Sequence, residues 1–184
     1  MHGHSSTLNA DMPMMVAHTA AVAKGAPSKF IVGDMPFLSF RKGIAEGVEA
    51  AGQLMKAGAH AVKLEGARGH LDLVHHLVES GIPVMGHLGL TPQSIHQLGG
   101  FKVQGRMPEE FQQILEDAFT LQKAGCFSIV LECVPAPLAE EITKKLQIPT
   151  IGIGAGSVTD GQVLVLQDML GMNPDFNPKF LKKY

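Results

Sequence analysis

Five ionisable residues stand at or near the ends of short apolar runs, where the side chains of parallel strands can act on one substrate. Two of them, Lys63 and Glu65, are separated by one residue, so both side chains leave a strand on the same face. Carboxylates are hard oxygen ligands, and Mg²⁺ usually takes one or two of them and leaves its other positions to water and substrate. Asp34 and Glu65 are therefore the candidate metal ligands, and the full set is Asp34, Lys63, Glu65, His87 and Glu132.

The other three residues suit carbon-acid chemistry on a small oxo acid. Lys63 could bind a substrate carboxylate or stabilise an enolate oxygen, and His87 could orient the substrate or donate a hydrogen bond to an oxyanion. Glu132 ends an apolar run, and a poorly hydrated carboxylate accepts a proton readily, so Glu132 is the candidate general base. Each of these residues also has a purely structural interpretation. Lys63 and Glu65 could form a buried ion pair, Glu132 could be paired with a neighbouring lysine, and His87 could be a hydrogen-bonded core residue.

One repeated pattern predicts the elements that position these residues. A helical stretch ends at Gly or just before Pro, and a short apolar run follows. The runs do not alternate with polar residues, which is typical of strands buried on both faces, and the repetition of strand and helix predicts parallel βαβ units. The predicted strands are residues 30–34, 61–65, 84–87, 128–132, 150–154 and 163–167, and the predicted helices are 41–56, 70–79, 108–123 and 138–146.

Two α/β architectures fit this order of elements: an open doubly wound sheet and a (β/α)₈ TIM barrel. An open sheet brings together only the strands at its switch point, whereas a barrel gathers the carboxyl ends of all its strands at one mouth. Ionisable residues on four strands therefore favour the TIM barrel, with about six of its eight strands present. No linker or low-complexity stretch divides the chain, so residues 1–184 are expected to form a single, partial β/α-barrel domain.

Composition excludes several other classes of protein. The 15 Lys and Arg residues nearly balance the 17 Asp and Glu residues, which gives no indication of a nucleic-acid or membrane partner. No apolar run is long enough to span a bilayer, the first residues do not have the pattern of a secretory signal, and two cysteines are too few for a disulfide framework. The sequence predicts a cytoplasmic enzyme, with Met12, Met14 and Met15 as core filler.

Motifs along nearly the whole chain resemble those of the ketopantoate hydroxymethyltransferase (3-methyl-2-oxobutanoate hydroxymethyltransferase) family. Two of the most specific are GHLGLTPQS at 86–94 and GGFKVQGR at 99–106. The other matching stretches are 3–8, 18–22, 34–37, 62–66, 131–135 and 151–156.

The resemblance implies a Mg²⁺-dependent barrel enzyme of pantothenate and coenzyme A biosynthesis. Family members transfer a hydroxymethyl group from 5,10-methylenetetrahydrofolate to 3-methyl-2-oxobutanoate, which gives 2-dehydropantoate in the first step of the pathway. Matched motif by motif, Asp34 binds metal and substrate, Glu65 binds metal, Lys63 binds substrate and Glu132 accepts the proton. The resemblance also implies a homo-oligomer, typically a decamer, whose partners are the 2-oxo acid and folate.

The chain departs from the family pattern at its start. The family's first metal ligand lies in a Gly-Asp-Ser stretch on the second strand, shortly before the match at 3–8, and the sequence begins after that point. We therefore expect the first two strands and a C-terminal helical segment to be absent from this chain. Two alternatives remain open: a non-catalytic barrel fragment, and a folate-independent Mg²⁺-dependent lyase or mutase of oxo acids, against which the 99–106 motif speaks. The sequence leaves the folate contacts, the oligomer size and the role of loop 99–106 open.

Overall fold

Across residue 4 and residues 6–184, which the computed structural model describes, six strands form one parallel sheet in chain order. Helices connect the first five strands, as the alternating pattern in the sequence predicts, and a loop without a helix connects the fifth strand to the sixth. The strands are β1 (Val32–Asp34), β2 (Ala61–Glu65), β3 (Val84–Gly89), β4 (Ser128–Glu132), β5 (Thr150–Ile153) and β6 (Gly161–Gln162).

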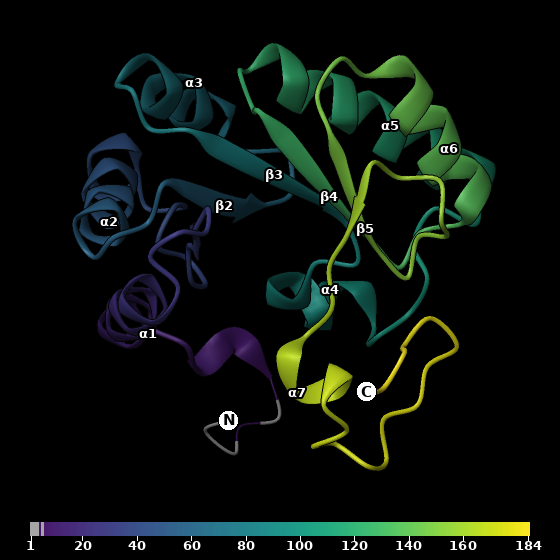
Figure 1. The fold of residues 1–184 in the computed structure, drawn as a ribbon. Helices are drawn as coiled ribbons and strands as arrows, with labels where there is room; N and C mark the ends of the chain where they lie inside the picture. The colour runs from purple at the N-terminus through teal and green to yellow at the C-terminus, as the bar shows by residue number, and fades with distance from the viewer. Residues whose placement is uncertain (1–3, 5) are drawn as a thin grey trace.

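Helices cover the outer side of the curved sheet: α2 (Ile44–Lys56), α3 (Leu71–Glu79), α5 (Pro108–Lys123) and α6 (Ala136–Lys145). The shorter helices α4 (Ile95–Leu98) and α7 (Leu166–Met169) lie on its opposite side (Figure 1). The buried core lies between the sheet and the outer helices and consists largely of Leu, Ile, Val and Ala side chains. The helices, including the 3₁₀ turns η1 and η2, are η1 (Thr7–Asn9), α1 (Met12–Gly25), α2 (Ile44–Lys56), α3 (Leu71–Glu79), η2 (Pro92–Ser94), α4 (Ile95–Leu98), α5 (Pro108–Lys123), α6 (Ala136–Lys145) and α7 (Leu166–Met169).

Helix α5 illustrates how the sequence sets the element boundaries. It begins at Pro108, which needs no hydrogen-bond partner for a backbone N–H, and Glu109 and Glu110 in its first turn interact favourably with the helix dipole. It ends at Lys123, and Gly125 takes a positive φ of 101° in the turn that follows. These features explain why this helix begins and ends where the sequence predicts.

The strand register aligns the polar residues at the carboxyl ends of the strands. Asp34 of β1 pairs with Lys63 of β2, and Glu65 of β2 pairs with His87 of β3. Glu132 pairs with Gly89, the last residue of β3. Neighbouring strands therefore place these side chains next to one another at one edge of the sheet.

Two parts of the predicted pattern differ from the structure. The prediction of a strand at 163–167 is wrong, because β6 covers only Gly161–Gln162 and α7 occupies Leu166–Met169. The apolar residues of that segment are largely exposed, for example Val165 at 49%, so its hydrophobicity does not reflect a buried strand. Helix α1 was not predicted, although Asp11 caps it by accepting a hydrogen bond from the Met14 N–H.

The remaining boundaries differ by a few residues. Strand β1 begins at Val32 rather than at residue 30, because Phe30 is exposed and stacks on His60. Strand β3 continues two residues past the predicted end. The expected core role of the methionines is confirmed for Met12 and Met15, which pack against the buried cluster. None of the helices in the described part of the chain is both long and apolar enough to cross a membrane.

Candidate active site

The carboxyl ends of β1 to β4 surround one cavity of about 220 Å³. The amino-terminal part of the chain, from η1 to α1, closes one side of it. The structure contains larger cavities. The 220 Å³ cavity is the candidate site because ionisable side chains from four strands converge in it. All five predicted residues contribute to the lining, which consists of Thr7, Ala10, Met15, Asp34, Pro36, Lys63, Glu65, His87, Pro92, Gln93 and Glu132.

An ion pair between Lys63 and Asp34 spans the cavity edge, with 2.9 Å between Nζ and Oδ2. Burial alone would lower the pKa of Lys63, but the charges of Asp34, Glu65 and Glu132 and a hydrogen bond to Asp34 outweigh it and raise that pKa. The ammonium group is therefore charged at neutral pH. The other carboxylate oxygen of Asp34, Oδ1, is buried and accepts no hydrogen bond from any described residue.

Glu65 is the most strongly desolvated acid of the site, with 5% of its surface exposed. Its Oε2 accepts a hydrogen bond from the Gln93 N–H at 2.9 Å. Burial raises the pKa of Glu65 to about 7, assisted by Asp34 and Glu132 and opposed by Lys63 and the Gln93 N–H. Burial therefore favours protonation of this carboxyl group at a pH well above that of an exposed glutamate.

His87 lies at the base of the cavity and is 2% exposed. Its Nδ1 lies 3.5 Å from Lys63 Nζ and 3.8 Å from Glu65 Oε1. Burial, and next the charge of Lys63, lower the pKa of His87, although Glu132 and Asp34 oppose this change. The imidazole is therefore neutral. Its Nε2 lies 3.2 Å from Glu132 Oε2, but the two groups are not aligned for a hydrogen bond, so the contact between them is electrostatic.

Glu132 is more exposed than the sequence suggested. About 20% of its side chain is open, compared with 6% for Glu65. The reason is its neighbour in the register, Gly89, which offers no side chain to cover it. The backbone around Glu132 is fixed, because its carbonyl accepts a hydrogen bond from the Leu90 N–H and the Cys133 N–H donates to Ile153. An open carboxylate on a fixed strand end suits proton transfer to a bound molecule.

Gln93 is a site residue that the sequence reasoning missed. Its backbone N–H donates to Glu65, and its side-chain amide donates to the Met35 carbonyl at 2.8 Å. It therefore joins the loop after β1 to the carboxylate at the end of β2. The available signal was its place in the 86–94 motif, directly after Pro92.

The donor set suits a divalent cation. Three carboxylates, of Asp34, Glu65 and Glu132, face the single ammonium of Lys63 beside a neutral imidazole, so negative charge is in excess. The buried, unpartnered oxygen of Asp34 would gain a partner from a cation. No cluster of three or more His, Cys, Asp or Glu residues with ligand spacing occurs among the described residues. A cation would take its remaining ligands from water and substrate, as Mg²⁺ commonly does.

The raised pKa of Glu65 gives a prediction about stability. The folded state binds this proton more tightly than the unfolded state, so stability falls as pH rises from about 4.5 to about 7. We expect Glu65→Gln to raise the free energy of unfolding of the metal-free chain on the order of 2 kcal/mol at pH 8, and to change it little at pH 4. Urea denaturation at both pH values measures this difference. Equal effects at the two pH values would contradict it.

Known proteins resemble this chain in sequence and in fold. The family model for ketopantoate hydroxymethyltransferase matches residues 1–184. The 3-methyl-2-oxobutanoate hydroxymethyltransferase of Bdellovibrio bacteriovorus is 65% identical over 184 residues, and the match covers 100% of this chain and 70% of that protein.

Solved structures show the same fold at low sequence identity. Phosphoenolpyruvate phosphomutase from Streptomyces platensis subsp. rosaceus superposes with a TM-score of 0.63 and 11% identity, over 90% of this chain and 64% of that one. Phosphonopyruvate hydrolase, solved with oxalate and Mg²⁺, superposes with a TM-score of 0.57 and 12% identity, over 80% of this chain and 53% of that one. These likenesses confirm the predicted partial TIM-barrel fold, and the matches in sequence show that the chain belongs to the ketopantoate hydroxymethyltransferase family.

Proposed function

We propose that this chain carries the site that transfers a hydroxymethyl group from 5,10-methylenetetrahydrofolate to 3-methyl-2-oxobutanoate and forms 2-dehydropantoate, the first step of pantothenate biosynthesis. The relatives are named as hydroxymethyltransferases, which supports this class of reaction. The observation that carries the proposal is the convergence of Lys63, Glu132 and two further acids on one cavity. A base, a fixed cation and acids that can hold a metal all promote proton abstraction beside a carbonyl.

In this proposal Asp34 and Glu65 hold Mg²⁺. When bound, Mg²⁺ supplies Lewis acidity that polarises the 2-oxo group and makes the C3 proton more acidic. The ion pair with Asp34 fixes the Lys63 ammonium, which binds substrate oxygen and stabilises the negative charge that develops there. His87 is buried beside Lys63 and Glu65. Because its imidazole is neutral, it contacts the substrate without adding a second positive charge.

Glu132 accepts the C3 proton in this scheme. Its carboxylate is open to the cavity, and the backbone hydrogen bonds on either side of it keep it at the strand end. The carbon that loses the proton forms a bond to the one-carbon unit of the donor. The unit's bonds to the donor nitrogens break, and water supplies the oxygen of the new hydroxyl group. The tetrahydrofolate that remains takes up the protons that balance this exchange.

The experiment that tests this proposal needs no folate. The chain is incubated with Mg²⁺ and 3-methyl-2-oxobutanoate in D₂O, and loss of the C3 proton signal is followed by NMR. We expect exchange that requires Mg²⁺, and we expect Glu132→Gln to slow it by about 100-fold or more because the proton acceptor is lost.

Glu140→Gln, the same chemical change on the exposed surface of α6, is the matched control and is expected to exchange at the wild-type rate. Equal rates for Glu132→Gln and Glu140→Gln would refute the proposed base. No exchange from folded wild-type chain would favour the non-catalytic fragment.

We also propose, on the family resemblance, a cytoplasmic homo-oligomer that binds neither nucleic acid nor membrane. The outer edges of β1 and β6 pair with no other strand in the described part of the chain. Unpaired strand edges favour further association, which supports contact with other polypeptide. Light scattering combined with size-exclusion chromatography would measure the oligomeric state.

A further inference from the structure

A second cavity, of about 500 Å³, adjoins the candidate active site and shares Glu65 and Gln93 with it. We call it the outer cleft. Its walls come from the loop between β1 and α2, the loop between β2 and α3, the segment formed by η2 and α4, and Asp117 of α5. Its volume lies in the range of cavities that hold cofactor-sized molecules. A ligand in the outer cleft would therefore reach the active site from the side of Gln93.

The loop after β1 gives the outer cleft an apolar wall. Phe37 and Leu38 line it and remain 40% and 45% exposed. Leu38 has a φ of 62°, which is strained for a residue with a branched side chain. Such strain persists where surrounding structure over-determines the backbone, often at ligand sites. A flat apolar or aromatic group fits against this wall.

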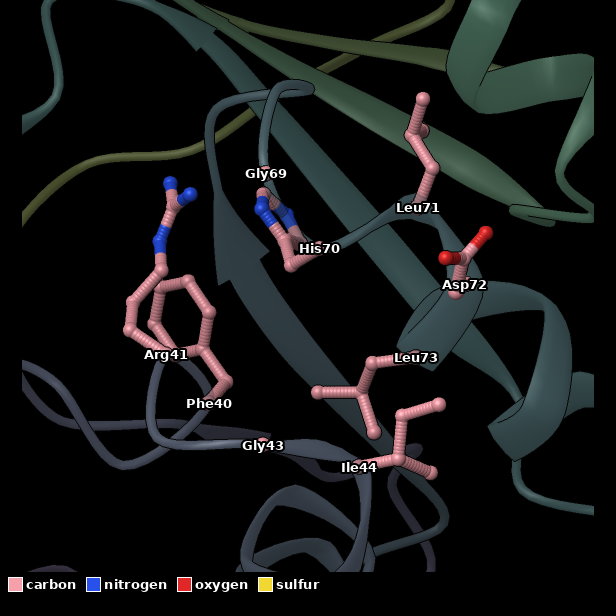
Figure 2. A pocket seen from close by; sticks show the side chains of 9 residues that line it. All are labelled: Phe40, Arg41, Gly43, Ile44, Gly69, His70, Leu71, Asp72 and Leu73. Atoms are coloured by element: carbon pink, nitrogen blue, oxygen red, sulfur yellow. The ribbon is translucent and has the colours of Figure 1, made fainter.

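Arg41 gives the outer cleft a fixed positive charge. One Nη atom donates to the Glu65 carbonyl at 3.2 Å, and the other donates to the Arg68 carbonyl. The guanidinium lies 5.1 Å from the centre of the Phe40 ring, and Figure 2 shows these two side chains beside each other. Arg41 forms no ion pair with the described residues, so its charge is held in place but not neutralised by a carboxylate in contact with it.

The other charges around Arg41 indicate on which side an anion would bind. In the outer cleft Arg68 pairs with Asp117 at 3.5 Å, so these two charges offset each other. The Glu65 carboxyl group also lines the outer cleft and interacts with the charge of Arg41, but it is buried and accepts a hydrogen bond from the Gln93 N–H. On the other side of Arg41 lies a separate cavity whose lining includes the Asp72 carboxylate (Figure 2). Asp72 disfavours an anion there, so the outer cleft is the better place for one.

We propose that the outer cleft binds the p-aminobenzoylglutamate half of the one-carbon donor, an inference that rests on the proposed function. The aromatic ring packs against Phe37 and Leu38, and a glutamate carboxylate pairs with Arg41. The pterin end, with the one-carbon unit, then extends past Gln93 into the active site. Each part of the donor thus has a counterpart in the cleft. The aromatic ring matches the apolar wall, the glutamate carboxylate matches the Arg41 guanidinium, and the reactive end matches the boundary that the cleft shares with the active site.

The test is the affinity of the chain for 5-formyltetrahydrofolate, a donor analogue that transfers no one-carbon unit here, measured by calorimetry. We expect Phe37→Ala and Arg41→Met each to weaken binding by about tenfold. Phe119→Ala is the matched control, because Phe119 is 39% exposed and is not among the residues that line the cleft. It is expected to bind as tightly as wild type. Arg41→Lys, which keeps the charge, is expected to fall between wild type and Arg41→Met.

A charge test separates a carboxylate contact from loss of loop structure in the Arg41 variant. The dimethyl ester of 5-formyltetrahydrofolate lacks both negative charges. Wild type is expected to bind the ester about tenfold more weakly than the acid, whereas Arg41→Met binds both alike. An Arg41→Met variant that keeps the wild-type preference for the acid overturns the assignment of Arg41.

The proposal is wrong if wild type does not bind the analogue, or if Phe37→Ala and Phe119→Ala bind it equally. Failure of the outer-cleft proposal can be distinguished from failure of the proposed function. The distinguishing measurement is proton exchange at C3, which is made without any folate. Exchange by wild type together with equal binding by the two phenylalanine variants rejects the outer cleft and leaves the proposed function intact. Absence of exchange from wild type counts against the proposed function itself.

Discussion

Replacement of Lys63 by Met should slow proton exchange at C3 by about 1000-fold, the larger of the effects expected at the site. Among the described residues that line the cavity, Lys63 has the only ammonium group facing the three carboxylates, and the variant loses it. Asp34 Oδ2 loses its partner at 2.9 Å. Lys63 also provides the main influence that lowers the pKa of Glu65, so Glu65 becomes more protonated at neutral pH and a weaker ligand for a cation.

The measurement is the exchange rate by NMR between pH 6 and pH 9. If the protonation of Glu65 contributes, the pH of half-maximal exchange moves upward in Lys63→Met. Lys63→Arg keeps the positive charge and is expected to retain more activity than Lys63→Met. Lys144→Met, on the exposed face of α6, is the control for loss of a lysine and should behave as wild type. A Lys63→Met rate within tenfold of wild type would contradict the assigned role.

Replacement of Gly89 by Ala should lower the free energy of unfolding by about 3 kcal/mol or more. Gly89 has a φ of 89°, which strains any residue with a Cβ atom. A Cβ atom there would also collide with the Glu132 carbonyl oxygen and lie 2.6 Å from Val134 Cγ1. The partner in this collision is backbone, so it cannot be relieved by a change of rotamer.

Gly52→Ala is the matched control for this prediction. Gly52 lies inside α2, and a Cβ atom there meets nothing within 4 Å. Alanine favours a helix interior, so this variant should gain about 0.5–1 kcal/mol. Urea denaturation compares the two variants, and similar midpoints would show that the site around Gly89 relaxes. Exchange activity of any folded Gly89→Ala chain reports whether Glu132 has moved.

The sequence was a good guide to the parts of the fold that Gly and Pro delimit. Helix α5 and strands β2 and β4 have the predicted boundaries, because helix caps and buried apolar runs are local signals. The segment at 163–167 misled the prediction, since Val163 and Val165 are apolar yet exposed. Hydropathy alone does not distinguish a buried strand from an apolar surface.

The candidate site was predictable in its members but not in its electrostatics. The residue types and strand ends were enough to bring together Asp34, Lys63, Glu65, His87 and Glu132. The sequence does not predict which acid is most desolvated, because desolvation depends on the side chains that cover each carboxyl group. Gln93 was missed for a similar reason: its contacts to Glu65 and Met35 arise from a loop conformation that no periodicity reports.

The chain-order arrangement of the sheet has a consequence for how the site forms during folding. Each polar group at the mouth lies beside a group from the next βα unit, since β1 pairs with β2, β2 with β3 and β3 with β4. Each contact between successive units closes a single crossover segment, which costs less loop entropy than pairing strands from distant parts of the chain. A polypeptide emerging from the ribosome could therefore assemble the mouth one neighbour at a time, and the Glu132 strand would complete it.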